Sequence, residues 1–118
     1  MKILKKNNFI ESIANALQYI SYYHSEDFIL AMRRAFEVEK SPVAKDAISQ
    51  VLTNSKLSAF NNRPICQDTG IVTVFVKQGM DLKWDSDKTI EEMVNQGVRN
   101  AYLDKDNPLR ASIVKDPI

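Results

Sequence analysis

The only cysteine of this 118-residue chain, Cys66, is followed directly by two polar residues, Gln67 and Asp68, in a segment that ends at Gly70. A thiolate sulfur is a soft ligand that suits zinc and iron–sulfur clusters. The neighbouring amide and carboxylate offer hydrogen bonds of opposite kinds to a bound polar molecule. This pattern indicates a loop able to bind a metal and contact a substrate. The structural alternatives are that the cysteine is a small buried apolar residue and that the aspartate fixes a turn before the glycine.

Four amphipathic helices are predicted to surround this loop. Apolar residues recur at helical spacing from Phe9 to Ile20, and Ser25 is followed by acidic residues typical of a first helical turn. Ser41 followed by a proline is a stronger helix start, because proline at the first position removes an amide that would be unpaired anyway. Thr89 opens a capping-box pattern for the fourth helix.

The segment after the cysteine is the predicted strand. Residues Ile71 to Val76 are mostly β-branched or aromatic, which favours an extended conformation. We expect Gln78-Gly79 to turn the chain back toward Leu82 and Trp84, forming a β-hairpin. The predicted fold class is α+β, with N-terminal helices, a hairpin and a further helix. The expected segments are a helical part over 1–60, a cysteine loop and hairpin over 61–86, and a helix with a second loop over 87–118.

The composition excludes several classes of protein. The chain is long enough for one domain, and its net charge of +1 gives no electrostatic reason to bind nucleic acid or an anionic membrane. Its longest apolar runs are too short to cross a bilayer. A single cysteine excludes an intrachain disulfide and fits a reducing cytoplasm. We therefore expect a cytoplasmic protein without nucleic-acid or membrane partners.

Several sequence motifs, in the same order, match one known family. They are Arg63 to Gly70, Val72 to Phe75, Asn95 to Tyr102, and Asn107 to Ser112. Together they resemble the class I, iron–sulfur-dependent fumarate hydratases and the related tartrate dehydratases, over about two thirds of the chain from Ala44 to Ile118. The resemblance implies that this chain is an incomplete, N-terminal part of a larger α/β catalytic domain.

The resemblance also assigns roles to single residues. In that family three cysteines hold a 4Fe–4S cluster, and Cys66 matches the first of them, while the other two are expected beyond Ile118. Gln67, Asp68 and Arg110 match positions that contact a dicarboxylate substrate. An arginine suits that role because its guanidinium donates two parallel hydrogen bonds to a carboxylate; a solvated surface arginine is the alternative. No residue here matches the catalytic base.

Three functions are left open by these observations. The first is a segment of a hydro-lyase that interconverts fumarate and malate, the second is an alpha-type segment of tartrate dehydratase, and the third is a truncated helical module without catalysis. For either enzyme we expect a 4Fe–4S cofactor and a dicarboxylate substrate. The expected partner is the remainder of the catalytic domain or a second subunit, in a homo-oligomer. One thiolate cannot hold such a cluster, so the chain alone is expected to be inactive.

Overall fold

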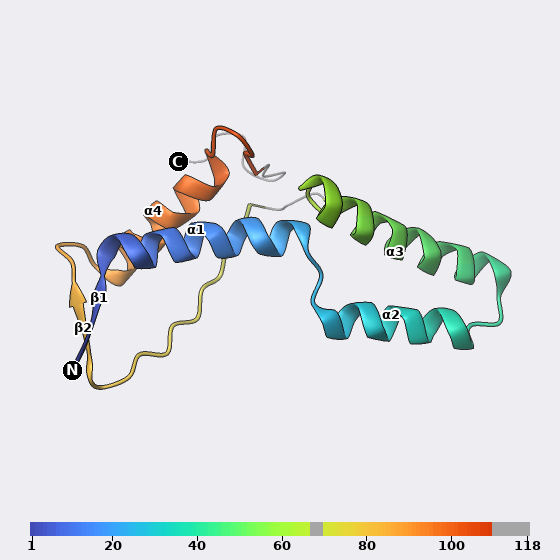
Figure 1. Cartoon of the computed structure of the whole chain (residues 1–118), viewed down its shortest axis with the longest axis horizontal. Coiled ribbons are helices and arrows are strands. Elements are labelled where there is room, and N and C mark those ends of the chain that lie inside the picture. Colours follow the sequence, from blue (N-terminus) through green and yellow to red (C-terminus); the bar gives the residue numbers. More distant parts are fainter. Residues whose placement is uncertain (67–69, 110–118) are drawn as a thin grey trace. The chain divides into compact units, whose positions relative to one another are not determined.

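The computed structural model of the chain describes residues 1–66 and 70–109. The described chain contains four helices and two short strands, which confirms the predicted α+β class and all four predicted helices (Figure 1). In order the elements are β1 (Lys2–Lys5), α1 (Lys6–Tyr22), α2 (Glu26–Val38), α3 (Pro42–Asn61), β2 (Leu82–Asp85) and α4 (Ile90–Tyr102). No helix in the described residues is long and apolar enough to span a membrane.

The starts of the helices follow from local capping chemistry. At α4 the Thr89 hydroxyl accepts a hydrogen bond from the Glu92 amide at 3.2 Å, and the Glu92 carboxylate accepts one from the Thr89 amide at 2.7 Å. This reciprocal pair is the predicted capping box. At α3 the Ser41 hydroxyl accepts from the Ala44 amide at 3.4 Å. Ser25 occupies the cap position of α2, but its side chain accepts no capping hydrogen bond.

The sheet differs from the prediction. β2 pairs in parallel with β1, in the register Lys2 to Leu82 through Lys5 to Asp85. The residues from Ile71 to Val76 are not assigned to a strand and form an elongated segment (Figure 1), so the predicted hairpin is wrong. The turn itself exists, because the Leu82 amide donates to the Gly79 carbonyl at 3.2 Å. The strand after that turn pairs instead with the N-terminal residues, where the sequence predicts no strand.

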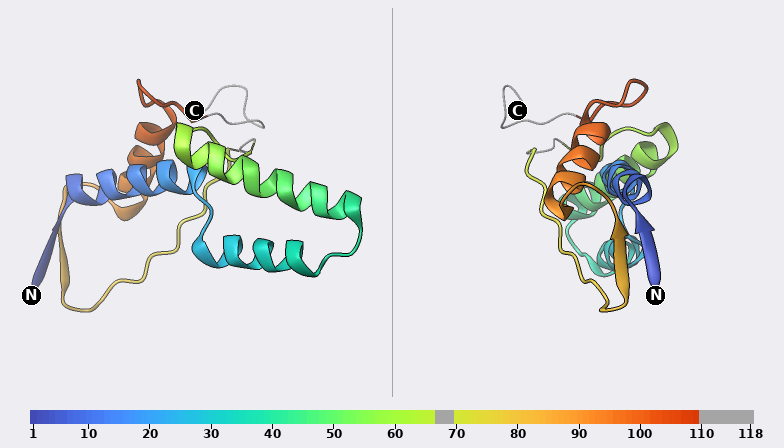
Figure 2. Two further views of the ribbon diagram at one scale, coloured as in Figure 1. Left: turned by 45° about the vertical axis from the view of Figure 1, so that its right-hand side comes forward. Right: turned by 90° about the vertical axis from the view of Figure 1, so that its left-hand side faces the viewer.

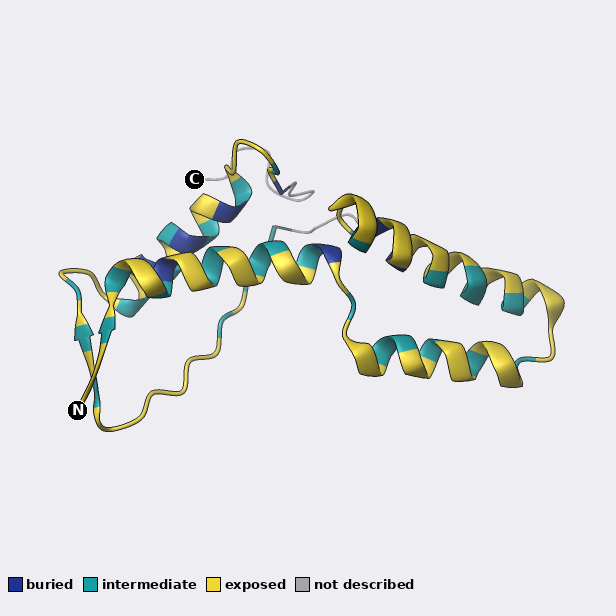
Figure 3. Cartoon of the chain, viewed as in Figure 1, coloured by how far each residue is buried: buried dark blue, intermediate teal, exposed yellow. Residues whose placement is uncertain are grey.

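The chain divides into two compact units, and residues 1–19 and 67–118 make up the first. Within this unit α1 packs against α4, and the parallel strands lie side by side (Figure 2). Phe9 of α1 contacts Trp84 of β2 edge to face, with ring centroids 4.9 Å apart. The buried residues, coloured dark blue in Figure 3, form a small core made of Ile10, Met93, Gly97, Ala101 and Leu109.

The second unit is the continuous stretch from residue 20 to 66. Helices α2 and α3 run back along each other in it (Figures 1 and 2). His24, in the loop before α2, lies with its Nδ1 2.9 Å from the Ser55 hydroxyl of α3 and stacks on Phe28. Ser55 is buried, so this hydrogen bond satisfies a polar group that would otherwise be costly to bury. His24 therefore joins the loop between α1 and α2 to α3.

Candidate functional site

The backbone on the N-terminal side of Cys66 is fixed within the second unit. Helix α3 ends at Asn62, whose backbone is left-handed with φ 49°, and the chain then turns toward the cysteine. The Ile65 amide donates to the Ser21 carbonyl at 2.8 Å, and the Ile65 carbonyl accepts from the Asn54 side chain at 2.8 Å. Both backbone groups of the residue before Cys66 are thus hydrogen bonded. The cysteine is held at a defined place on the unit.

Cys66 itself is exposed and its thiol is free. This rules out the alternative of a buried apolar cysteine and leaves the sulfur accessible to a metal or a reactant. In residues 1–66 and 70–109 no three histidine, cysteine or acidic side chains lie close enough to hold a metal ion together. Among the described residues, Cys66 is therefore a single accessible thiol and not part of a complete metal site.

Gln67, Asp68 and Arg110, the three predicted substrate contacts, lie outside the described residues. Their roles stay predictions. The residues that flank them are described. Gly70 has φ 83°, a left-handed conformation that favours glycine and explains why the loop ends at this residue. Leu109, directly before Arg110, is only 7% exposed and belongs to the core of the first unit.

The turn between α4 and Leu109 is held by side chains that sequence reasoning did not assign. The Asp104 carboxylate accepts hydrogen bonds from the amides of Asp106 at 3.0 Å and Asn107 at 2.8 Å. From α1, the Gln18 amide group donates to the Ala101 carbonyl at 2.8 Å and to the Asn107 carbonyl at 2.9 Å. The role of Asp104 has a local signal, since aspartate often bonds to its own turn. Gln18 has no such signal.

Two hollows border the elements of the first unit. An apolar one of about 570 Å³ lies between the elongated segment and α4, lined mainly by Val72, Val74, Val94 and Val98. It begins at Gly70, directly after the cysteine loop. Valines on alternate positions of the segment therefore face the helix, while Phe75 between them is 93% exposed. The apolar lining suits covering by other apolar groups rather than binding of a charged acid.

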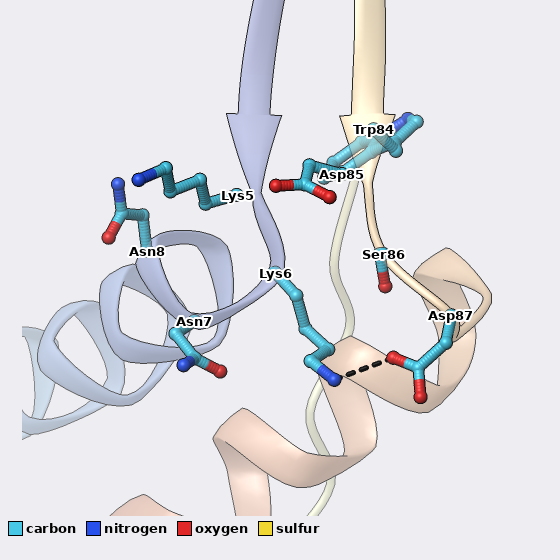
Figure 4. A pocket seen from close by; sticks show the side chains of 8 residues that line it. All are labelled: Lys5, Lys6, Asn7, Asn8, Trp84, Asp85, Ser86 and Asp87. Atoms are coloured by element: carbon cyan, nitrogen blue, oxygen red, sulfur yellow. Dashed lines mark hydrogen bonds and ion pairs between the residues drawn. The ribbon is translucent and has the colours of Figure 1, made fainter.

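A polar hollow of about 710 Å³ lies where β1 meets α1 and β2 runs toward α4 (Figure 4). Lys6 and Asp87 form an ion pair across it. The hydrogen bond from Lys6 lowers the pKa of the Asp87 carboxyl below its ordinary value. Cys66, the one predicted site residue that the structure describes, is not among the residues that line this hollow. Its charges are already paired in part, and it is separate from the cysteine loop in the sequence.

Comparison with known proteins identifies the family. Residues 10–118 match the sequence model of a family described as fumarate hydratase (Fumerase). The chain belongs to the fumarate hydratase family. The matched region is longer than the motifs implied, because it also includes α2 and most of α1. No solved structure matches the chain.

Relatives within this family carry the name of a dehydratase subunit. A putative L(+)-tartrate dehydratase subunit alpha from Methanocaldococcus jannaschii is 32% identical over 92 residues, which cover 78% of this chain and 32% of the relative. L(+)-tartrate dehydratase subunit alpha from Escherichia coli is 28% identical over 109 residues, covering 92% of this chain and 35% of the relative. The subunit alpha from Shigella sonnei gives the same values. The chain thus spans about one third of the length of these relatives.

Proposed function

We propose that this chain is the N-terminal part of a hydro-lyase that adds water to, or removes it from, a small dicarboxylic acid, with fumarate and malate as the first candidate pair. The observation that supports this most is the family match over residues 10–118. The match spans both units of the fold, so the helices that hold the cysteine loop belong to the family segment as much as the loop does.

Cys66 is proposed as one ligand of a 4Fe–4S cluster. Its exposed thiol and the two hydrogen bonds that fix Ile65 beside it support this role. When bound, such a cluster with an open iron position supplies a Lewis acid for the hydroxyl group of the substrate. The remaining ligands would come from polypeptide that corresponds to the other two thirds of the relatives. The chain by itself is then inactive.

Gln67, Asp68 and Arg110 are proposed to bind the dicarboxylate. The amide and the carboxylate next to Cys66 would orient the hydroxyl group, and the arginine would bind a substrate carboxylate with its paired donors. Binding by two parallel hydrogen bonds fixes the plane of the carboxylate as well as its position. That orientation is what a dehydration at the neighbouring carbon requires.

Dehydration of tartrate is the second candidate. The relatives from Methanocaldococcus jannaschii and Escherichia coli are both named as L(+)-tartrate dehydratase subunit alpha. Tartrate is also a 2-hydroxy dicarboxylate, so the same three side chains would bind it. A name that includes a subunit letter further suggests that a second subunit completes this enzyme. A helical module without catalysis is the remaining alternative.

The test is a pair of substitutions in the enzyme completed by its partner polypeptide and assembled without oxygen. Arg110→Lys keeps the charge and loses the paired donors, so we expect turnover of the preferred acid to fall about 10- to 100-fold with the cluster retained. Cys66→Ser replaces a soft ligand by a hard one, and we expect the cluster to be lost. Activity is measured with fumarate and with L-tartrate, and the cluster by iron and sulfide content and by absorbance.

Arg34→Lys, which changes an exposed arginine on α2, is the matched control and should leave both quantities unchanged. The ratio of activities toward the two acids decides between the first and second candidates. Loss of the cluster in Arg110→Lys, or a cluster and full activity in Cys66→Ser, would show that the roles are assigned wrongly. Absence of iron and sulfide from the wild-type assembly would favour the module without catalysis.

A further inference from the structure

Gln18 connects two places on the backbone that lie on either side of one turn. Its side-chain amide donates to the carbonyl of Ala101, in the last turn of α4, and to the carbonyl of Asn107. The N···O distances are 2.8 Å and 2.9 Å, typical of good hydrogen bonds. Both partners lie more than eighty residues away along the chain, in the same unit as Gln18.

The chemistry of the two bonds requires an amide. The last carbonyls of a helix have no partner within the helix, and Ala101 is in that position. A glutamine NH₂ group carries two hydrogens, so one side chain satisfies both carbonyls. A glutamate of the same shape has no hydrogen to donate when ionised, and its negative oxygens would face two carbonyl oxygens.

The backbone between these points has its own restraints. Asp104 accepts from the amides of Asp106 and Asn107, which closes the turn internally. After Asn107 comes Pro108, whose ring fixes its φ angle, and then the buried Leu109. Gln18 therefore links an internally closed turn to α1 at both of its ends. These contacts together restrain the described backbone from Ala101 to Leu109.

We infer that Gln18 is a positioning residue for the proposed carboxylate-binding segment, because Arg110 follows Leu109 directly in the sequence. The inference rests on the proposed function, in which Arg110 binds a substrate carboxylate. Gln18 does not contact the substrate in this scheme. It acts by fixing the backbone from Ala101 to Leu109, and its loss should weaken substrate binding more than turnover.

The variant that tests this is Gln18→Glu, with Gln50→Glu as the matched control. Gln50 is exposed on α3, and its side chain donates to Asp46 of the same helix. In the completed enzyme we expect Gln18→Glu to raise KM for the preferred dicarboxylate about tenfold, with kcat changed less than about threefold and cluster content unchanged. Gln50→Glu should leave KM as in the wild type. A lower melting temperature with unchanged KM would mean that Gln18 only stabilises the fold, and would overturn the inference.

A second readout does not need activity. In the 118-residue chain, amide hydrogen exchange at Asp106 and Asn107 should become about tenfold faster in Gln18→Glu, while exchange at Met93 near the start of α4 stays unchanged. If the wild-type assembly turns over neither acid, the proposed function fails but this measurement still decides whether Gln18 holds the turn. Unchanged exchange at both amides overturns the inference in every case. If Gln18→Glu does not fold, Gln18→Asn, which keeps the donors but is one methylene too short, is measured in the same way.

Discussion

Gly97 shows how one residue sets the distance between two helices. A methyl group added at this position of α4 would lie 2.7 Å from Cβ of Ile13 in α1 and 2.9 Å from the carbonyl oxygen of Ile10. Real carbon atoms do not approach that closely. The neighbouring atoms belong to backbone and to a β-branched stem, which have little freedom to move. The glycine therefore permits the close packing that buries Met93 and Ala101.

Gly97→Ala should destabilise the protein by about 1–2 kcal/mol, because the cost of overpacking exceeds the gain of about 1 kcal/mol in helix propensity. Gly79→Ala is the control, since an added methyl group there meets no atom within 4 Å. The free energy of unfolding of the Gly79→Ala variant should differ from that of the wild type by less than about 1 kcal/mol. Urea unfolding followed by circular dichroism measures both variants. If Gly97→Ala proved more stable than the wild type, the close helix contact would be wrong.

Single residues were predictable from sequence only where their signal was local. Cys66 stands out because it is the only cysteine, and its thiol is exposed; its role as a ligand stays a prediction. Asn54 and Gln18 were missed, although they fix the backbone beside the cysteine and beside Leu109. Each donates to backbone carbonyls on another element, and such contacts leave no spacing pattern. The only hint is Asn54 itself, a poor helix former in the middle of α3.

At the scale of elements, the helices were predictable and the strand pairing was not. Helix caps and apolar periodicity depend on residues a few positions apart, so all four helices could be identified. β1 is four residues long with two lysines and an apolar pair, and nothing in it points to a partner beyond residue 80. Ile71 to Val76 has strand composition, but its valines face α4 and the segment belongs to no strand pair of the described chain. Composition predicted its extended form but could not predict pairing.

The capping box of α4 should make the stability of the first unit depend on pH. Hydrogen bonds from the Thr89 backbone and side chain lower the pKa of the Glu92 carboxyl below its ordinary value of 4.5. A lowered pKa means that the ionised carboxylate contributes stability above about pH 4.5, and that this contribution is lost as the pH falls through the lower folded value. The difference in stability between the wild type and Glu92→Gln should therefore shrink on going from about pH 5 to about pH 3.

Urea midpoints at the two pH values measure that difference. Glu91→Gln removes the neighbouring charge from the same first turn without touching the capping box, so it is the matched control. If the difference in stability between the wild type and Glu92→Gln stayed constant or grew from about pH 5 to about pH 3, the capping role of the Glu92 carboxylate would be contradicted. The effect is expected to be small, because the carboxylate is exposed to solvent.

At the scale of the whole molecule, the described chain presents an uncovered edge. Among the described residues, none forms a backbone hydrogen bond with residues 72–77. Phe75 within this segment and Met80 after it are almost fully exposed. Unpaired strand-like segments with apolar side chains favour association with other polypeptides. The relatives are about three times as long as the region they share with this chain.

We therefore predict that the 118-residue chain associates with itself at micromolar concentrations. Size-exclusion chromatography with light scattering should show oligomers, and Phe75→Lys should shift them toward the monomer because a charge beside the edge opposes pairing. Phe60→Lys is the control, since Phe60 is 87% exposed on α3 but lies on a helix whose backbone is already bonded. A monodisperse monomer with one cooperative unfolding transition would instead indicate a self-sufficient module.

The parallel pairing of β1 with β2 also has a consequence for the order of events during synthesis. The second unit is one continuous stretch and can fold as soon as residue 66 has left the ribosome. β1 and most of α1 are made before it, yet their partners β2 and α4 follow it in the sequence. The apolar face of α1 therefore stays exposed to solvent until the ribosome has added most of the described chain. Contacts between distant residues form slowly, so this interval is when the nascent chain most needs protection from aggregation.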